Sequence, residues 1–130
     1  MEKIEVIFAG NKKVNVKFRG FEIKTDQPVE AGGDGTAPTP YDLFMASLAA
    51  CAGIFAISFF QTRRLNTDGF KMWLEVEWDG VKHRLSKVVI KMKLSSNFPE
   101  KYKKALMESV SLCSVKRTII DPPEFDVVVE

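Results

Sequence analysis

Cys51 and Cys113 are the residues of this 130-residue chain whose types could most readily do chemistry. No second cysteine and no histidine stands near either of them at a spacing that would hold zinc. Two cysteines are also too few for a disulfide scaffold. Their chemistry would therefore be the redox chemistry of thiols, and the sequence predicts neither a metal nor any other cofactor.

The two cysteines have different local surroundings. Cys51 lies in the middle of a long apolar run, where burial raises the pKa of a thiol, and a small buried hydrophobic side chain is the competing interpretation. Cys113 lies near the predicted start of a short helix, with Lys116 and Arg117 just behind it. Free backbone N–H groups and cations both favour a thiolate. Local sequence thus makes Cys113 the readier nucleophile, with a core position as its alternative, and the 62-residue spacing does not show that the thiols meet.

Other candidate residues carry weaker signals. His83 stands between Lys82 and Arg84 beside a predicted turn, and we interpret it as solvated instead of catalytic. The glycines within residues 31–35 resemble a phosphate-binding loop, but no strand directly precedes them and no Lys-Ser/Thr pair follows. Asp42 is expected to cap a helix and not to act as a base.

The composition indicates one globular domain, residues 1–130. Apolar residues make up 45% of the chain and charged residues 28%, which excludes a disordered or low-complexity chain. The net charge is only +2 and the charges are interspersed, so nucleic acid is not an expected partner. Because the N-terminus alternates charged and apolar residues without the apolar stretch of a secretory signal, we expect a cytoplasmic protein.

The first half of the chain is predicted to form a three-stranded meander followed by a helix. Alternating apolar and polar residues predict strands at residues 4–8, 14–18 and 21–25. A loop rich in Gly and Pro follows, from residue 26 to residue 40. Thr39 as N-cap, with Pro40 and Asp42 in the first turn, then predicts a helix that runs to about Arg64.

The second half contains strands in a run and then helices. Residues 70–78 and 85–94 alternate around a turn and predict a hairpin. Residues 97–100 cap a second helix, Ser111 opens or re-caps a short third helix that ends before Asp121, and residues 125–129 close the chain as a strand. Strands in runs predict an α+β fold with antiparallel sheets.

Residues 43–60 form a run of 18 residues without a charge, at the lower limit for a membrane span. The amphipathic strands on both sides favour a buried helix of a soluble domain instead, since one helix could not house them in a bilayer. A helix that is apolar all round must be covered on every side. A domain of this size has difficulty doing so alone, and we therefore expect a homodimer with no membrane partner.

The string GGDGTAPTPYDLFMASLAAC at residues 32–51, followed by LCSVKRTI at residues 112–119, resembles the OsmC/organic hydroperoxide resistance superfamily. Its members pair a segment of glycines, a helix-starting proline and a helical cysteine with a distal C-x-V-x-x-T segment. The resemblance covers essentially the whole chain. It implies an α+β, OsmC-like domain with a long central helix buried in an intertwined homodimer.

The resemblance also implies roles for both cysteines. Cys51 would be the peroxidatic thiolate that attacks an organic hydroperoxide, and Cys113 would resolve the resulting sulfenic acid into a disulfide. An external dithiol would then reopen the disulfide. The protein would thus be a cysteine-based hydroperoxide reductase of oxidative-stress defence. These roles are opposite to those that local sequence favours, and the cation that Cys51 needs would have to come from a distant arginine.

The chain departs from the family pattern beside the helix start. Peroxidase members carry a Glu directly after the proline, where this chain has Tyr41 and then Asp42. Arg19 is the only arginine before the helix and hence the candidate activating arginine, with a solvated turn residue as its alternative. A divergent, non-catalytic dimer that senses redox state or binds an apolar ligand is therefore the alternative function, and structural cysteines are a third. The sequence does not identify the hydroperoxide, the ligand or the reductant.

Overall fold

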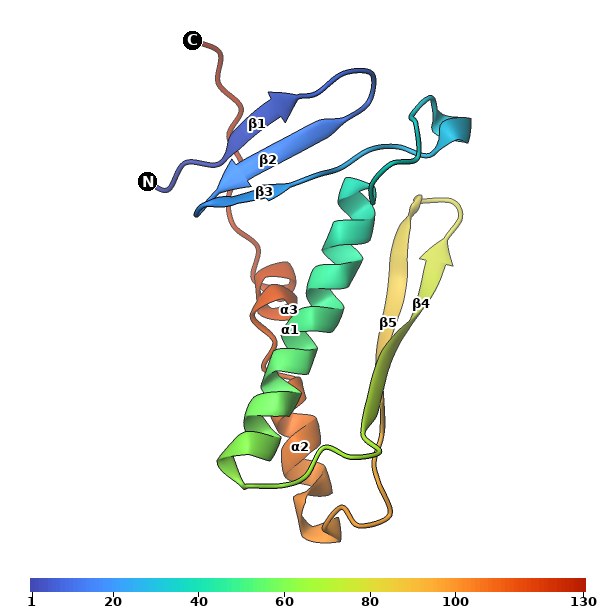
Figure 1. Ribbon diagram of the computed structural model, residues 1–130, viewed down its shortest axis with the longest axis vertical. Helices are drawn as coiled ribbons and strands as arrows, with labels where there is room; N and C mark the ends of the chain where they lie inside the picture. The colour runs from blue at the N-terminus through green and yellow to red at the C-terminus, as the bar shows by residue number, and fades with distance from the viewer. The chain divides into compact units, whose positions relative to one another are not determined.

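The computed structural model describes residues 1–130 (Figure 1). The chain divides into two compact units, residues 1–46 and residues 47–130, and the boundary falls within the long helix α1, Pro40–Thr62. All strand pairs in both units are antiparallel. The mixture of antiparallel sheets and helices confirms the α+β fold class.

The first unit is built on a three-stranded meander. Its strands are β1 (Glu5–Phe8), β2 (Val14–Phe18) and β3 (Phe21–Ile23), in the order β1-β2-β3. Arg19 and Gly20 form the turn between β2 and β3, with φ angles of 53° and 80° that suit a two-residue hairpin. The predicted meander is confirmed, although β3 ends two residues earlier than expected.

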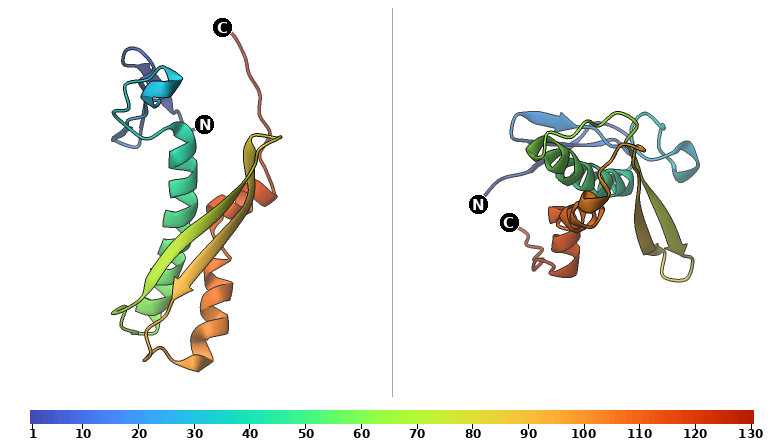
Figure 2. Two further views of the ribbon diagram at one scale, coloured as in Figure 1. Left: turned by 90° about the vertical axis from the view of Figure 1, so that its right-hand side faces the viewer. Right: turned by 90° about the horizontal axis from the view of Figure 1, so that it is seen from below.

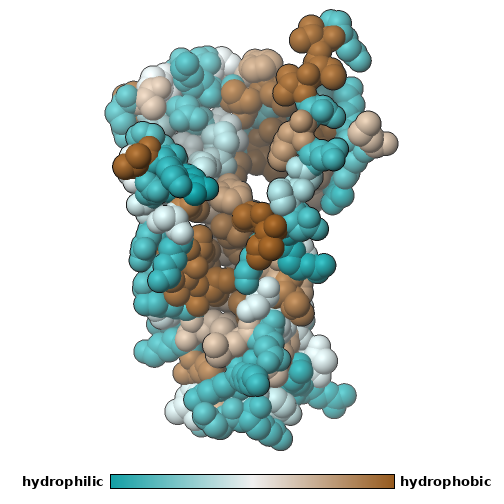
Figure 3. All heavy atoms as spheres, turned by 180° about the vertical axis from the view of Figure 1, so that it is seen from behind, coloured by the Kyte–Doolittle hydropathy of each residue, from teal (hydrophilic) through white to brown (hydrophobic).

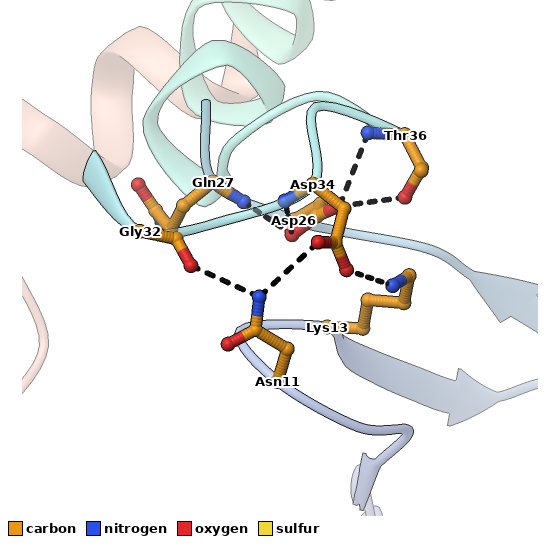
Figure 4. A network of polar contacts seen from close by, with 7 residues as sticks. All are labelled: Asn11, Lys13, Asp26, Gln27, Gly32, Asp34 and Thr36. Carbon is orange, nitrogen blue, oxygen red and sulfur yellow. Dashed lines mark hydrogen bonds and ion pairs between the residues drawn. The ribbon is translucent and has the colours of Figure 1, made fainter. Parts of the chain in front are cut away.

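A buried carboxylate organises the loop after β3. Asp26 is fully buried, and it accepts hydrogen bonds from the backbone N–H of Gln27 at 2.8 Å and from the Thr36 hydroxyl at 2.6 Å and backbone N–H at 3.1 Å (Figure 4). Asn11 donates to the Gly32 carbonyl at 2.9 Å from the opposite side of the loop. The loop contains the short 3-10 helix η1, Val29–Ala31. Residues without hydrophobic periodicity are thus ordered by polar contacts.

Helix α1 begins with a capping box. The Asp42 backbone N–H donates to the Thr39 hydroxyl at 3.1 Å, and the Thr39 backbone N–H donates to the Asp42 carboxylate at 3.0 Å. This reciprocal pair satisfies two N–H groups that a helix start leaves unpaired. The predicted N-cap and the capping role of Asp42 are confirmed, and the helix ends at Thr62, two residues short of the prediction.

The second unit packs a hairpin and two helices against α1. The hairpin, β4 (Lys71–Asp79) and β5 (Arg84–Lys93), runs alongside α1 (Figure 2). The 3-10 turn η2 (Glu100–Tyr102) leads into α2 (Lys103–Val110), and α3 (Ser114–Ile120) follows. The Phe60 ring lies 4.7 Å from that of Phe70 and 5.5 Å from that of Phe98. The buried core consists of Ala52, Ala56, Phe59, Phe60, Phe98, Leu106 and Val110.

Two predictions for the C-terminal part of the chain are wrong. Ser111 does not begin the third helix but is the C-cap of α2, and Cys113 is the N-cap of α3. Residues 125–129 form no strand, and Val127 and Val129 are 95% and 96% exposed. Their alternating pattern marks a segment able to pair with a sheet edge, but a strand also needs a partner, and no backbone bond from another strand reaches this segment.

Helix α1 is apolar on faces that the second unit does not cover. Its most apolar 18 residues have a mean hydropathy of 2.2, enough by length and composition to cross a membrane. That is weak evidence for a span, since core helices meet the same criterion. Phe59 and Phe60 are buried in the unit's own core, whereas Ile54 is 62% exposed. Figure 3 shows apolar side chains, in brown, lying open on the surface.

Candidate functional site

The second unit brings the two cysteines together. Cys51 lies near the middle of α1 and is half-buried, whereas Cys113 lies between α2 and α3 and is only 1% exposed. Although they are 62 residues apart in sequence, their side chains are joined by a hydrogen bond. Both are free thiols. The pair is therefore placed for thiol–disulfide chemistry.

Cys113 also shapes the start of α3. Its Sγ accepts a hydrogen bond from the Lys116 backbone N–H at 3.5 Å, and its carbonyl accepts one from the Arg117 backbone N–H at 3.0 Å. Cys113 thus accepts from the backbone N–H groups of Lys116 and Arg117. The backbone N–H groups of Ser114 and Val115 instead donate to the sulfur of Cys51. The short helix thus presents two backbone donors to the first thiol.

These donors favour the thiolate of Cys51. The backbone N–H of Val115 lowers the pKa of Cys51 most, and the Cys113 side chain and the Ser114 backbone N–H lower it further. Burial opposes them only in part, so the pKa of Cys51 lies below its ordinary value. A thiolate is the nucleophilic form of cysteine. The geometry hence favours Cys51 as the attacking thiol.

Cys113 is shifted in the opposite direction. Burial raises the pKa of its thiol, and the neighbouring Cys51 raises it further, while the Lys116 backbone N–H offsets part of the effect. The local argument for Cys113 as the readier nucleophile left out its near-complete burial, and this burial outweighs the backbone donors beside it. The direction agrees with the roles that the family resemblance implies: Cys51 ionises first, and Cys113 stays a thiol that donates to it.

An apolar cavity of about 460 Å³ opens beside the cysteine pair. That volume lies within the range of small-molecule sites, about 300–1,000 Å³. Cys113 forms part of its wall, and Lys116 is its one charged lining residue. The remaining lining side chains are aliphatic: Leu48, Leu74, Val88, Val89, Ile90, Ile119 and Ile120.

The structure gives other positions to the remaining candidate residues. Arg19 lies in the first unit, whereas both cysteines lie in the second, and its guanidinium donates to Glu2 at 2.5 and 2.9 Å. Asp42 is occupied by the capping box. His83 is exposed in the β4–β5 turn with a φ of 52°. No group of three His, Cys, Asp or Glu side chains could hold a metal ion.

Sequence reasoning missed three contributors to the site. The backbone N–H groups of Ser114 and Val115 carry no signal in residue type, because every residue except proline has one. Lys116 was noted only as a cation near Cys113, and its place in the cavity wall depends on tertiary packing. The one signal for the two backbone N–H groups was the short helix predicted next to Cys113, because the first turn of a helix has free N–H groups.

The comparisons with solved structures show the fold. A Psychrobacter arcticus 273-4 protein assigned to the osmotic stress induced and detoxification response aligns with a TM-score of 0.75 at 23% identity, over 91% of this chain and 88% of that one. An OsmC-like protein from Mycoplasma pneumoniae aligns with a TM-score of 0.71 at 16% identity, over 94% and 89% of the two chains. An organic hydroperoxide resistance protein OsmC from Legionella pneumophila aligns with a TM-score of 0.58 at 19% identity, over 92% and 88%.

The family follows from the sequence itself. No curated protein is similar enough to the chain to count as a match. The sequence model of the OsmC-like proteins, however, matches residues 33–128, which include both cysteines and the whole of α1. This chain therefore belongs to the OsmC-like protein family.

Proposed function

We propose that the protein is a thiol-dependent reductase of organic hydroperoxides. The observation that carries the proposal is the hydrogen-bonded pair of Cys51 and Cys113, in which the pKa of Cys51 is lowered and that of Cys113 is raised. A two-cysteine peroxidase needs this asymmetry, with one thiol ready to attack and a second held back beside it. Membership of the OsmC-like family supports the same assignment.

In the first step the Cys51 thiolate attacks the distal oxygen of the hydroperoxide. The O–O bond breaks, Cys51 becomes a sulfenic acid, and the leaving alkoxide takes a proton to become an alcohol. The hydroperoxide is reduced by two electrons and the sulfur is oxidised by two. Backbone N–H groups of Ser114 and Val115 hold the thiolate in place for this attack.

In the second step Cys113 resolves the sulfenic acid. Its sulfur, having lost its proton, attacks the Cys51 sulfur, the S–O bond breaks, and the hydroxyl leaves as water after taking up a proton. The product is a Cys51–Cys113 disulfide. An external dithiol then restores both thiols by exchange and is itself oxidised to a disulfide.

The apolar cavity favours organic hydroperoxides over hydrogen peroxide. Burial of each CH₂ group contributes about 0.8 kcal/mol, which a substrate without carbon cannot gain. The cavity wall contains Cys113, so a ligand there lies beside the reacting pair. The Legionella pneumophila structure of the same fold is named for organic hydroperoxide resistance, which supports this substrate class and a role in oxidative-stress defence.

A cytoplasmic homodimer is part of the proposal. The exposed apolar residues of α1 and of residues 125–129 need a cover that the single chain does not supply. Arg19 stays the candidate activating arginine, which would have to leave Glu2 to act on Cys51. Its planar, permanently charged guanidinium suits a thiolate and a peroxide oxygen.

The test combines intact mass, a free-thiol count and turnover. One equivalent of cumene hydroperoxide should remove two protons and both thiols from the wild type. Cys113→Ser should gain one oxygen and form no intramolecular disulfide, and Cys51→Ser should not react. With a dithiol present, only the wild type should turn over at its full rate. Consumption by Cys51→Ser at the wild-type rate would refute the proposal.

A specific observation favours a second function, a non-catalytic dimer that senses redox state or binds an apolar ligand. Tyr41 occupies the position of the activating Glu, and the neighbouring carboxylate of Asp42 is committed to the helix cap. Unchanged mass and two free thiols after peroxide treatment would favour this second function.

A further inference from the structure

The peptide group between Ser114 and Val115 connects two hydrogen bonds at the start of α3. Its N–H belongs to Val115 and donates to the sulfur of Cys51. Its carbonyl belongs to Ser114 and accepts from the hydroxyl of Thr118 at 2.9 Å. Because a peptide unit is planar, its carbonyl and its N–H turn together. A bond that fixes the carbonyl therefore also fixes the direction of the N–H.

The place of this peptide in α3 leaves its N–H available to the sulfur. α3 begins at Ser114, so the N–H of Val115 lies in the first turn. N–H groups of the first turn have no carbonyl of their own helix to bond. The sulfur of Cys51 thus accepts from a donor that the helix itself leaves unpaired.

The same kind of hydroxyl bond occurs elsewhere in the chain without this consequence. Two other hydroxyl groups donate at 2.8 Å to the carbonyl four residues earlier, that of Thr62 to Ser58 and that of Ser111 to Met107. Those carbonyls lie inside α1 and α2, so the N–H groups of their peptides bond within the helix. Of the three hydroxyl groups, that of Thr118 is the one that acts on a peptide whose N–H reaches a thiol.

The stability of α3 does not account for the hydroxyl of Thr118. Threonine is among the poorer helix formers, and a hydroxyl that bonds back four residues slightly destabilises a helix. The side chain of Thr118 is exposed, so water is open to its hydroxyl as another partner. The hydroxyl nevertheless donates to the Ser114 carbonyl. Its effect is therefore to be sought at the peptide that it holds.

We propose that Thr118 is a positioning residue, whose hydroxyl aims the N–H of Val115 at the sulfur of Cys51. Hydrogen bonds in a chain polarise one another, so a donor to the carbonyl strengthens the N–H bond on the other side of the peptide by about 10–30%. That N–H does more than any other donor to favour the thiolate of Cys51. Thr118 acts through the peptide and does not touch the sulfur. The inference rests on the proposed function only in taking Cys51 as the attacking thiol.

Alkylation of the reduced protein across pH, with mass spectrometry to identify the modified cysteine, tests the proposal. Thr118→Val keeps the branched shape but removes the hydroxyl, so the apparent pKa of Cys51 should rise by about half a unit. Thr118→Ser keeps the hydroxyl and should lie close to the wild type. Thr62→Val removes the same kind of bond from α1 and is the matched control, so it should leave the pKa of Cys51 unchanged.

Amide NMR separates positioning from mere support of the helix. In Thr118→Val the chemical shift of the Val115 amide proton should change, because its hydrogen bond is weakened. The amides of Arg117 and Asp121, which bond to carbonyls at the start and end of α3, should keep their protection from exchange. Loss of that protection together with the rise in the pKa of Cys51 would show that Thr118 only supports the helix, and would overturn the proposal.

Two results of the alkylation experiment would also overturn the proposal. One is an unchanged pKa of Cys51 in Thr118→Val, and the other is an equal rise in Thr62→Val. Neither alkylation nor NMR uses peroxide. A protein that gives the expected results in both without peroxide turnover would instead refute the proposed function alone.

Discussion

The hydrogen-bond donors around Cys51 lower the pKa of its thiol more than burial raises it, and this net shift can be measured. Alkylation of the reduced protein by iodoacetamide across pH should show an apparent pKa below that of a free thiol, about 8.5. The reason is that the N–H of Val115, the Cys113 thiol and the N–H of Ser114 all favour the thiolate. Mass spectrometry would identify Cys51 as the first residue modified, because Cys113 is buried and its pKa is raised.

Cys113→Ala separates the contributions of the two kinds of donor. The variant removes the thiol hydrogen bond but keeps the backbone N–H groups, so the pKa of Cys51 should rise towards the free-thiol value without passing it. Alanine also removes the Sγ cap of α3, so the variant is compared only if its circular dichroism spectrum matches that of the wild type. A Cys51 that titrates at or above the free-thiol value in the wild type would contradict the donor geometry.

The sequence singled out the two cysteines that the structure brings together, but it did not predict the opposite shifts of their pKa values. Composition and spacing singled out both cysteines, yet the 62 residues between them carried no sign of contact. The local argument favoured Cys113 because it counted cations and helix N–H groups near in sequence. Burial of Cys113 and the donation of the Val115 N–H to Cys51 are both tertiary effects, and no local pattern reports them.

At the scale of elements, the capping box should contribute measurably to the stability of α1. Thr39→Ala removes the hydroxyl that accepts the Asp42 N–H and should lower the free energy of unfolding by about 1 kcal/mol. Thr39→Ser keeps the acceptor and should lie close to the wild type. Urea denaturation followed by circular dichroism measures both. Equal losses in the two variants would show that the hydroxyl does not cap the helix.

The loop around Asp26 should make stability depend on acid pH. Hydrogen bonds from the Thr36 hydroxyl and backbone N–H, then from Gln27 and Asp34, hold the pKa of Asp26 far below its ordinary value. A carboxyl group with a depressed folded-state pKa stabilises the protein above its unfolded-state pKa of about 3.9, and that stability is lost as the pH falls below it. The urea concentration at the midpoint of unfolding of the wild type should therefore fall as the pH is lowered from 5 to 3.

Asp26→Asn is the variant that isolates this contribution. Asparagine places N–H donors against the donors of Gln27 and Thr36, so the variant should be less stable than the wild type at pH 7 and should lose less stability on acidification. Asp126→Asn changes an exposed carboxylate of the C-terminal segment and is the matched control. An Asp26→Asn protein with the wild-type pH profile would show that the acid response arises elsewhere.

Elements whose determinants are local were predictable, and those that need a distant partner were not. The three-stranded meander, the β4–β5 hairpin and the start of α1 follow from alternation, turn residues and caps that lie within a few positions of one another. The start of α3 was missed because Cys113, a weak acceptor, caps it in place of Ser111. The C-terminal strand was wrong for a different reason, since alternation specifies a face but not the edge that pairs with it.

At the scale of the whole molecule, the proposed homodimer would explain the apolar side chains that the single chain leaves exposed. Ile54 and Ile57 on α1 are exposed, and so are Phe125 and Val127 in the C-terminal segment. Exposed apolar residues that lie together in a patch mark association surfaces in proteins. An isologous pair of α1 helices would cover the first group in both copies at once. It would leave the C-terminal segments free to add to a sheet edge of the partner.

A dimer through α1 should be sensitive to one charge on its exposed face. Each dimer would bury two copies of Ile54, at about 1.5–3 kcal/mol each, so Ile54→Lys should raise the dissociation constant by about a hundredfold or more. Light scattering coupled to size exclusion, over a dilution series, should give a dimer for the wild type and monomer for the variant. Val81→Lys places the same charge in the hairpin turn, at a residue that is also exposed, and should stay dimeric. A wild type that is monomeric at every concentration, or an Ile54→Lys protein as dimeric as Val81→Lys, would show that the apolar face of α1 has some other cover.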